Sequence, residues 1–321
     1  MQWICMVFAV LEVAKTVVDA ASLVRLLKYL AIGFVINTPI LMSAIVLGRW
    51  THSGHSRFEP YGASSLQIGM VFTMTVGFTL YLALRDRVIP MRLVWTGTAA
   101  AASGMALLSG SRSVIITIMG VCVPLGLTML RKPVLAVPMI GILLVGIAVV
   151  LSRVDSNPFA RYKSLESARG SQAVEYIRES ISQRPLTGLL GTSGLQAEAD
   201  ESLGFHAHNA YLKQAYIGGL ALAGPYLVLA AISLGATFYV WRYRTLMDVD
   251  PLLISTLAAF MAMVYAQGMV NHMIYLGTNT WGFLHLLLSV LFLTWASELM
   301  RFRRNNPGMA AILARRQMQP A

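Results

Sequence analysis

The sequence predicts an all-α, polytopic bundle of membrane-spanning helices. Of its 321 residues, 56% are hydrophobic and 12% are charged, and the mean hydropathy is +0.64. Soluble globular proteins carry about twice that share of charged residues. The apolar residues also run in stretches of about 20, the length that a helix needs to cross the hydrocarbon layer. Such a span has to be helical, because lipid offers the backbone no hydrogen-bond partners.

Eight stretches are long enough to span a membrane and contain no Asp, Glu, Lys or Arg: 29–48, 60–84, 93–111, 113–130, 133–152, 214–240, 251–271 and 273–297. A ninth stretch, residues 1–18, is interrupted by Glu12 and Lys15. It either spans the membrane or only dips into it. We therefore expect eight or nine spans.

The formal net charge of +11 is compatible with nucleic-acid binding, but its placement favours a topological role. The basic clusters close short connections on alternate sides of the spans, which is typical of cytoplasmic loops. These clusters are Arg25/Lys28, Arg85/Arg87/Arg92, Arg131/Lys132, Arg242/Arg244 and Arg301/Arg303/Arg304. We expect a lipid bilayer and no nucleic acid as partner.

The same alternation places one long polar segment outside. The chain then divides into N-terminal helices (1–152), a periplasmic loop (153–209), C-terminal helices (210–300) and a basic cytoplasmic tail (301–321). Within the loop, Val174, Ile177 and Ile181 recur at helical spacing, which predicts a helix lying on the membrane surface. The helix ends before Pro185, because the proline ring removes a backbone donor.

The loop ends in His206-Ala207-His208-Asn209, close to Asp200 and Glu201. Two histidines separated by one residue are a weak metal-binding pattern, so we expect no metal and no cofactor. The sequence also contains no Walker loop, zinc-ligand quartet or nucleophile elbow, which disfavours an ATPase, a zinc site and an α/β-hydrolase.

The pair His208-Asn209 stands at the mouth of a span and is followed by the glycine step Gly218-Gly219-Leu220. With these motifs the chain resembles the O-antigen ligase and O-antigen polymerase superfamily of bacterial envelope glycosyltransferases. The upstream motifs that share the resemblance are Arg57–Pro60, Ser109–Ser113, Ser167–Arg169 and Arg184–Gly188. The likeness extends from about residue 30 to about residue 279. The chain departs from the family in lacking a second glycine at Leu222, and in having roughly three fewer N-terminal spans.

The resemblance implies a metal-independent glycosyltransferase of the bacterial inner membrane. It would move a glycan from undecaprenyl diphosphate to an acceptor hydroxyl on the periplasmic face. The acceptor is lipid A–core in a ligase and another lipid-linked glycan in a polymerase; both remain open, with a slight preference for the ligase. A transporter of lipid-linked sugar is the rival class, and Pro124, Pro138 and Pro225 are the places where its broken helices would occur.

The resemblance also implies roles for five residues. Arg112 and Arg169, with Arg161 behind them, would bind the diphosphate, because guanidinium groups hold phosphate oxygens bidentately. His208 would accept the proton of the acceptor hydroxyl, and Asn209 would orient the imidazole. Four of these residues have an ordinary alternative. Arg112 would then be an interfacial arginine and Arg169 a solvated loop charge. His208 would be an interfacial histidine and Asn209 a helix N-cap.

Overall fold

The computed structural model describes residues 12, 20–48, 50–53, 57–61, 65–109, 112–130, 133–152, 185–188, 210–268 and 280–306. The chain divides into two compact units. We call residues 16–165 with 248–260 the amino-terminal unit, and residues 1–15, 166–247 and 261–321 the carboxy-terminal unit. Each is described by itself.

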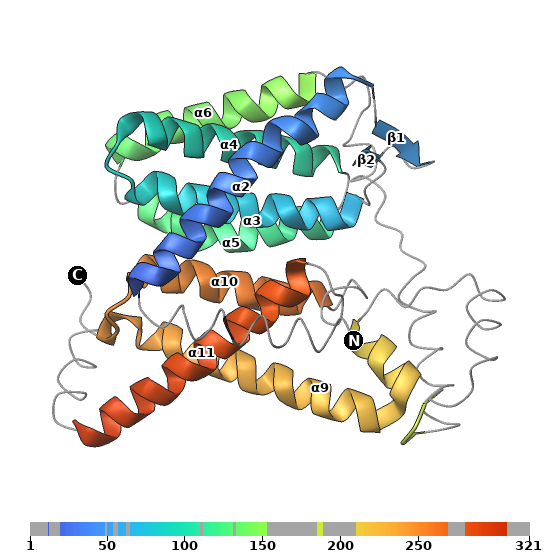
Figure 1. Ribbon diagram of the computed structural model, residues 1–321, viewed down its shortest axis with the longest axis vertical. Coiled ribbons are helices and arrows are strands. Elements are labelled where there is room, and N and C mark those ends of the chain that lie inside the picture. The colour runs from blue at the N-terminus through green and yellow to red at the C-terminus, as the bar shows by residue number, and fades with distance from the viewer. Residues whose placement is uncertain are drawn as a thin grey trace. The chain divides into compact units, whose positions relative to one another are not determined.

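The described residues form mainly helices (Figure 1). The amino-terminal unit contains α2 (Ala20–Val46), β1 (Trp50–Ser53), β2 (Arg57–Pro60), α3 (Ser65–Arg85), α4 (Ile89–Leu108), α5 (Arg112–Leu130), α6 (Pro133–Ser152) and the first part of α10 (Pro251–Gly268). The carboxy-terminal unit contains α9 (Ala210–Arg242), the 3-10 turn η2 (Arg244–Leu246), the rest of α10, and α11 (Thr280–Asn305).

Helices occupy the eight apolar stretches that the sequence singles out, so the prediction of a helical fold is confirmed. Four segments of the described helices are long and apolar enough to cross a membrane: Ser22–Val46, Gly218–Arg242, Pro251–Gly268 and His285–Asn305. The larger number of spans stays a prediction. Apart from Glu12, the stretch 1–18 lies outside the described residues, as does the surface helix expected around 174–181.

Several boundaries differ from the sequence prediction, among them both ends of α11, which runs from Thr280 to Asn305 and not from 273 to 297. Helix α2 starts at Ala20, nine residues before the expected Tyr29, and thus includes Arg25 and Lys28. Their side chains are exposed, so the helix continues through them without burying a charge. The stretch expected from residue 60 becomes helical only at Ser65, because residues 57–60 form a strand.

That strand belongs to a two-stranded antiparallel hairpin, which was not predicted. Trp50 pairs with Pro60 and Ser53 with Arg57, so the two backbones satisfy each other's hydrogen-bonding groups. The hairpin is followed by Tyr61, whose hydroxyl lies 2.5 Å from Ser43 Oγ on α2.

Small residues bring the helices of the amino-terminal unit into close contact. A Cβ added at Gly69 would lie 2.4 Å from Val114 Cγ2, and one added at Gly77 would lie 2.7 Å from Val121 Cγ1. The valine side chains of α5 therefore pack directly against the glycine backbone of α3. This close approach is typical of helices packed in membranes, where van der Waals contact takes over from the hydrophobic effect.

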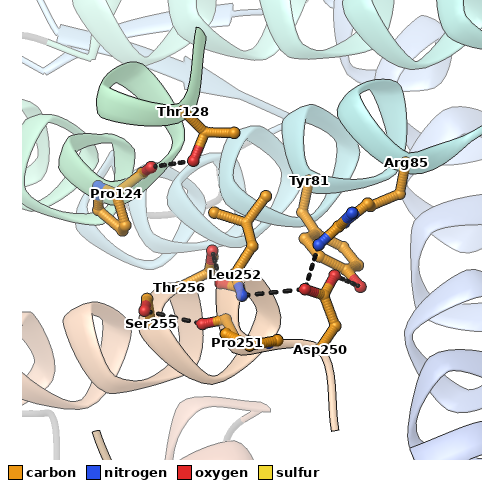
Figure 2. A network of polar contacts seen from close by, with 9 residues as sticks. All are labelled: Tyr81, Arg85, Pro124, Thr128, Asp250, Pro251, Leu252, Ser255 and Thr256. Carbon is orange, nitrogen blue, oxygen red and sulfur yellow. Dashed lines mark hydrogen bonds and ion pairs between the residues drawn. The ribbon is translucent and has the colours of Figure 1, made fainter. Parts of the chain in front are cut away.

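Asp250 joins α10 to α3 within the amino-terminal unit (Figure 2). Its Oδ1 accepts the backbone N–H of Leu252 at 3.0 Å, as expected of an N-cap aspartate followed by Pro251. Its Oδ2 accepts the Tyr81 hydroxyl at 3.0 Å, and its carboxylate pairs with Arg85. We call this arrangement the Asp250 clamp.

In the carboxy-terminal unit α9 packs against α11, and α9 bends sharply near its start (Figure 1). The bend is the feature around which the described part of the candidate site is built.

Candidate functional site

The predicted site residues fall into two groups. Arg112 is the first residue of α5, and its side chain is not described. It follows a short corner in which buried Ser109 caps α4 by donating its hydroxyl to the Ala106 carbonyl at 2.6 Å. His208, Asn209, Arg161 and Arg169 lie outside the described residues. Their predicted roles, and that of Arg112, stay predictions.

The described part of the candidate site lies at Gly219, where α9 is interrupted. Gly219 has φ +58° and ψ −155°, a backbone conformation that essentially only glycine adopts. Pro225, expected from the sequence as a possible breaking point, lies inside the helical run that follows. The glycine step therefore breaks the helix.

A second segment of the chain is held at this break. The turn Pro185–Gly188 presents two carbonyls to α9: that of Pro185 accepts the N–H of Leu220 at 2.9 Å, and that of Leu186 accepts the N–H of Ala221 at 3.1 Å. A helix that restarts after a break leaves its first N–H groups without intrahelical acceptors. The turn supplies acceptors for two of them. We call this arrangement the Gly219 dock.

The dock requires glycine for a second reason. A Cβ at position 219 would lie 2.5 Å from the carbonyl carbon of Leu186, 2.6 Å from its oxygen and 2.7 Å from the nitrogen of Thr187. These are backbone atoms, which cannot rotate away. Gly188, at the other end of the turn, is buried and also has a positive φ, +53°.

The break folds the start of α9 back along the helix. The rings of Tyr211 and Tyr226 are 5.8 Å apart, centroid to centroid, in an edge-to-face arrangement. In a straight helix, residues with this spacing are about 22 Å apart along the axis. The short segment before Gly219 and the long one after it therefore form a sharp angle.

The start of α9 is also tied to α10 and α11. The Tyr211 hydroxyl donates to the Tyr265 carbonyl at 3.0 Å, and the Tyr265 hydroxyl lies 2.9 Å from His285 Nε2. Tyr265 and His285 are both buried. His285 therefore makes a buried contact between α10 and α11.

The sequence analysis did not identify Tyr226 or Tyr265. The signal for them is physical: a tyrosine inside an apolar stretch needs a partner for its hydroxyl, so it marks a contact between helices. The partners lie on another helix or across the break in α9, so the pattern alone does not identify them.

The arrangement can hold a polar loop against a membrane helix. His208 and Asn209 immediately precede Ala210, the first residue of α9. The turn at 185–188 comes before this pair in the chain, and the break at Gly219 comes after it. The dock joins these two flanking segments through backbone hydrogen bonds. Two motifs of the resemblance, the Pro-Leu-Thr-Gly turn and the glycine step, thus meet in space.

No protein-family model matches the chain, and neither a curated protein nor a solved structure is significantly similar to it. The fold and the described site define the class of protein: a helical membrane protein with several helices of spanning length.

Proposed function

We propose that the chain is a glycosyltransferase of the bacterial inner membrane, similar to O-antigen ligases and polymerases. It has eight or nine spans and a loop at 153–209 that faces the periplasm. The reaction transfers a glycan from undecaprenyl diphosphate to an acceptor hydroxyl. The observation that carries the proposal is the Gly219 dock, because it joins two separate motifs of the resemblance that flank the His208-Asn209 pair in the sequence.

The chemistry needs one base and a cationic surface. His208 accepts the proton of the acceptor hydroxyl while its oxygen bonds to the anomeric carbon, and Asn209 orients the imidazole. The bond from that carbon to the diphosphate breaks, and the diphosphate leaves with the electron pair. Arg112, Arg169 and Arg161 compensate its charge, so the transfer proceeds without a metal ion.

The interruption of α9 is the one observation that favours a transporter instead, because transporters bind substrates at broken helices near the bilayer midplane. The apolar segment Gly218–Arg242 has 25 residues. It is about 37 Å long at 1.5 Å per residue, more than the roughly 30 Å of the hydrocarbon layer. The break therefore falls at one end of a full-length span and not in its middle. That position suits an enzyme site at the membrane surface.

The experiment uses purified protein in detergent, a polyprenyl-diphosphate-linked oligosaccharide and lipid A–core, in excess EDTA. We expect His208→Ala to lower turnover by roughly a hundred- to ten-thousand-fold, the usual contribution of a general base. His206→Ala is the matched control, because it removes an imidazole two residues away, and it should stay active. Donor incubated alone distinguishes the two enzymes, since a polymerase lengthens the lipid-linked glycan and a ligase does not.

Three outcomes would contradict the proposal. One is product formation by His208→Ala at the wild-type rate. Another is activity that disappears with EDTA and returns with magnesium or manganese. The third is movement of the donor across liposome membranes by wild-type protein without any covalent product, which would favour the transporter.

A further inference from the structure

One end of the carboxy-terminal unit carries a cluster of arginines that the proposed reaction does not use. Helix α11 buries Phe292, Ala296 and Leu299 at helical spacing, and the next residue on this stripe is Arg303. Because Arg303 lies on the face of α11 that is buried, its guanidinium needs hydrogen-bond or ionic partners within the protein or at the membrane surface.

Among the described residues, Arg303 contacts two tyrosines at and just after the end of α9, Tyr239 and Tyr243. Its Nη1 donates to the Tyr239 hydroxyl at 3.0 Å, and its guanidinium carbon lies 4.3 Å from the centroid of the Tyr243 ring. The two tyrosine rings are themselves 5.0 Å apart. This is a cation–π arrangement that orients the guanidinium without neutralising its charge.

Two more guanidinium groups lie at the same end. That of Arg242 is 5.9 Å from the centroid of Tyr243, and that of Arg244 is 5.1 Å from the centroid of Trp241. Arg244 is held in place by donating to the Trp241 carbonyl at 2.8 Å. Arg303 and Arg242 thus approach one aromatic ring.

Acidic residues are few near this cluster. Among the described residues 210–250, 261–268 and 280–306 they are Asp248, Asp250 and Glu298. Asp250 is paired with Arg85, and Glu298 stands five residues before Arg303, on another face of α11. Asp248 is exposed and follows Arg244 by four residues. The three guanidinium groups therefore exceed the acidic side chains that follow or precede them in the chain without another partner, and they attract an anion; guanidinium groups match phosphate oxygens bidentately.

The surroundings identify the kind of anion. Phe238 is 58% exposed and Trp241 40% exposed, on the same end of α9 as the cluster, and Met300 and Phe302 are exposed on α11. Aromatic side chains of this kind mark the interface between water and lipid in membrane proteins. We propose that Arg303, Arg242 and Arg244 bind the phosphate of an anionic phospholipid whose acyl chains lie against these apolar side chains.

The test is native mass spectrometry of the full chain in a neutral detergent, with added phosphatidylglycerol or phosphatidylcholine of identical acyl chains. Wild-type protein should retain phosphatidylglycerol preferentially. Arg303→Gln should lower its affinity about tenfold, the loss expected for one charge-assisted contact. Arg301→Gln is the matched control, because it removes the same charge from the opposite face of α11 and should leave the affinity unchanged.

The aromatic support is tested separately. Tyr243→Leu should weaken phosphatidylglycerol binding, whereas Tyr243→Phe keeps the ring and should retain it. If Arg303→Gln fails to fold, the double variant Arg242→Gln/Arg244→Gln tests the same site and should show the same loss.

The proposal is overturned if the two lipids bind equally, or if Arg303→Gln and Arg301→Gln weaken binding to the same extent. Inorganic phosphate at millimolar concentration should not displace the lipid. Displacement by free phosphate would show that the arginines recognise a soluble anion and not a phospholipid.

Discussion

The Asp250 clamp and the Gly219 dock both fasten one segment of the chain to a helix, but they do so with different atoms. The clamp uses side chains: a carboxylate accepts a tyrosine hydroxyl and pairs with a guanidinium. The dock uses the backbone: two carbonyls accept two N–H groups, and a missing Cβ makes the approach possible. A contact built from side chains can be weakened in steps by conservative substitutions. A contact built from backbone depends on conformation and tolerates almost none.

The largest effect is therefore expected at the dock. In Gly219→Ala the added Cβ meets the backbone of Leu186, and the alanine cannot adopt φ +58° with ψ −155° without strain. We expect a loss of stability of about 3 kcal/mol or more, from backbone strain together with two hydrogen bonds. The thermal unfolding midpoint of the purified protein measures it.

Gly224→Ala is the control for this prediction. It lies on the same helix and has nothing within 4 Å of its added Cβ, so it should be neutral or stabilising by up to about 1 kcal/mol. Equal midpoints for the two variants would show that the dock does not hold the loop to α9.

At the clamp the expected effect is smaller and graded. Asp250→Ala removes the N-cap of α10, the acceptor of Tyr81 and the partner of Arg85, and should cost about 2–3 kcal/mol. Asp250→Asn keeps the cap and an acceptor for Tyr81 and should cost about 1 kcal/mol, because an ion pair with a half-exposed arginine contributes little. The thermal unfolding midpoint should therefore be highest for wild type, lower for Asp250→Asn and lowest for Asp250→Ala. If Asp250→Asn is as unstable as Asp250→Ala, the ion pair with Arg85 is the main contribution and this ranking is wrong.

The smallest effect concerns a second side-chain contact of the amino-terminal unit, in the connection between α3 and α4. The Asp86 carboxylate accepts the Val88 backbone N–H at 3.1 Å and the Trp95 indole N–H at 3.2 Å. These bonds, the Val88 bond first, lower the pKa of the Asp86 carboxyl below its usual value.

Because the pKa of Asp86 is lowered, the direction in which stability changes with pH is defined. The stabilisation is fully present above the ordinary aspartate pKa, near 4, and is lost as the pH falls through the lower value of the folded protein. Between pH 6 and pH 3 the midpoint of wild type should fall slightly more than that of Asp86→Asn, which lacks this titration. Parallel pH profiles would show that the carboxylate contributes nothing to stability.

The two contacts also differ in how far they are predictable from sequence. Gly219 was recognised as part of a glycine step, since a resemblance between motifs attaches to consecutive residues. Asp250 was not singled out, because its partners Tyr81 and Arg85 come from a helix more than a hundred residues earlier in the chain. The pairing of Tyr265 with His285 was not identified either, because the two residues lie on different helices although they are 20 residues apart in the chain.

The apolar stretches predicted the helices well, because the length of an uncharged run is a local property. They missed the hairpin at 50–60, where the sequence shows no alternating pattern to mark a strand. The boundary at Ala20 was missed because exposed Arg25 and Lys28 interrupt the apolar run without interrupting the helix. The roles of Arg112, Arg161, Arg169, His208 and Asn209 stay predictions.

The dock has a consequence for chimeras in which a segment of this chain is replaced. Because the turn 185–188 is fastened to α9, the connection between α6 and α9 consists of two shorter ones, 153–184 and 189–209, with a common anchor. A chimera that grafts the second stretch alone keeps this anchor and closes only a short loop. A chimera that replaces 153–209 as a whole also replaces the turn 185–188, but it keeps the break in α9 to which that turn is bound. The natural module for exchange is therefore the stretch from 189 onward, or the entire loop together with the first turns of α9.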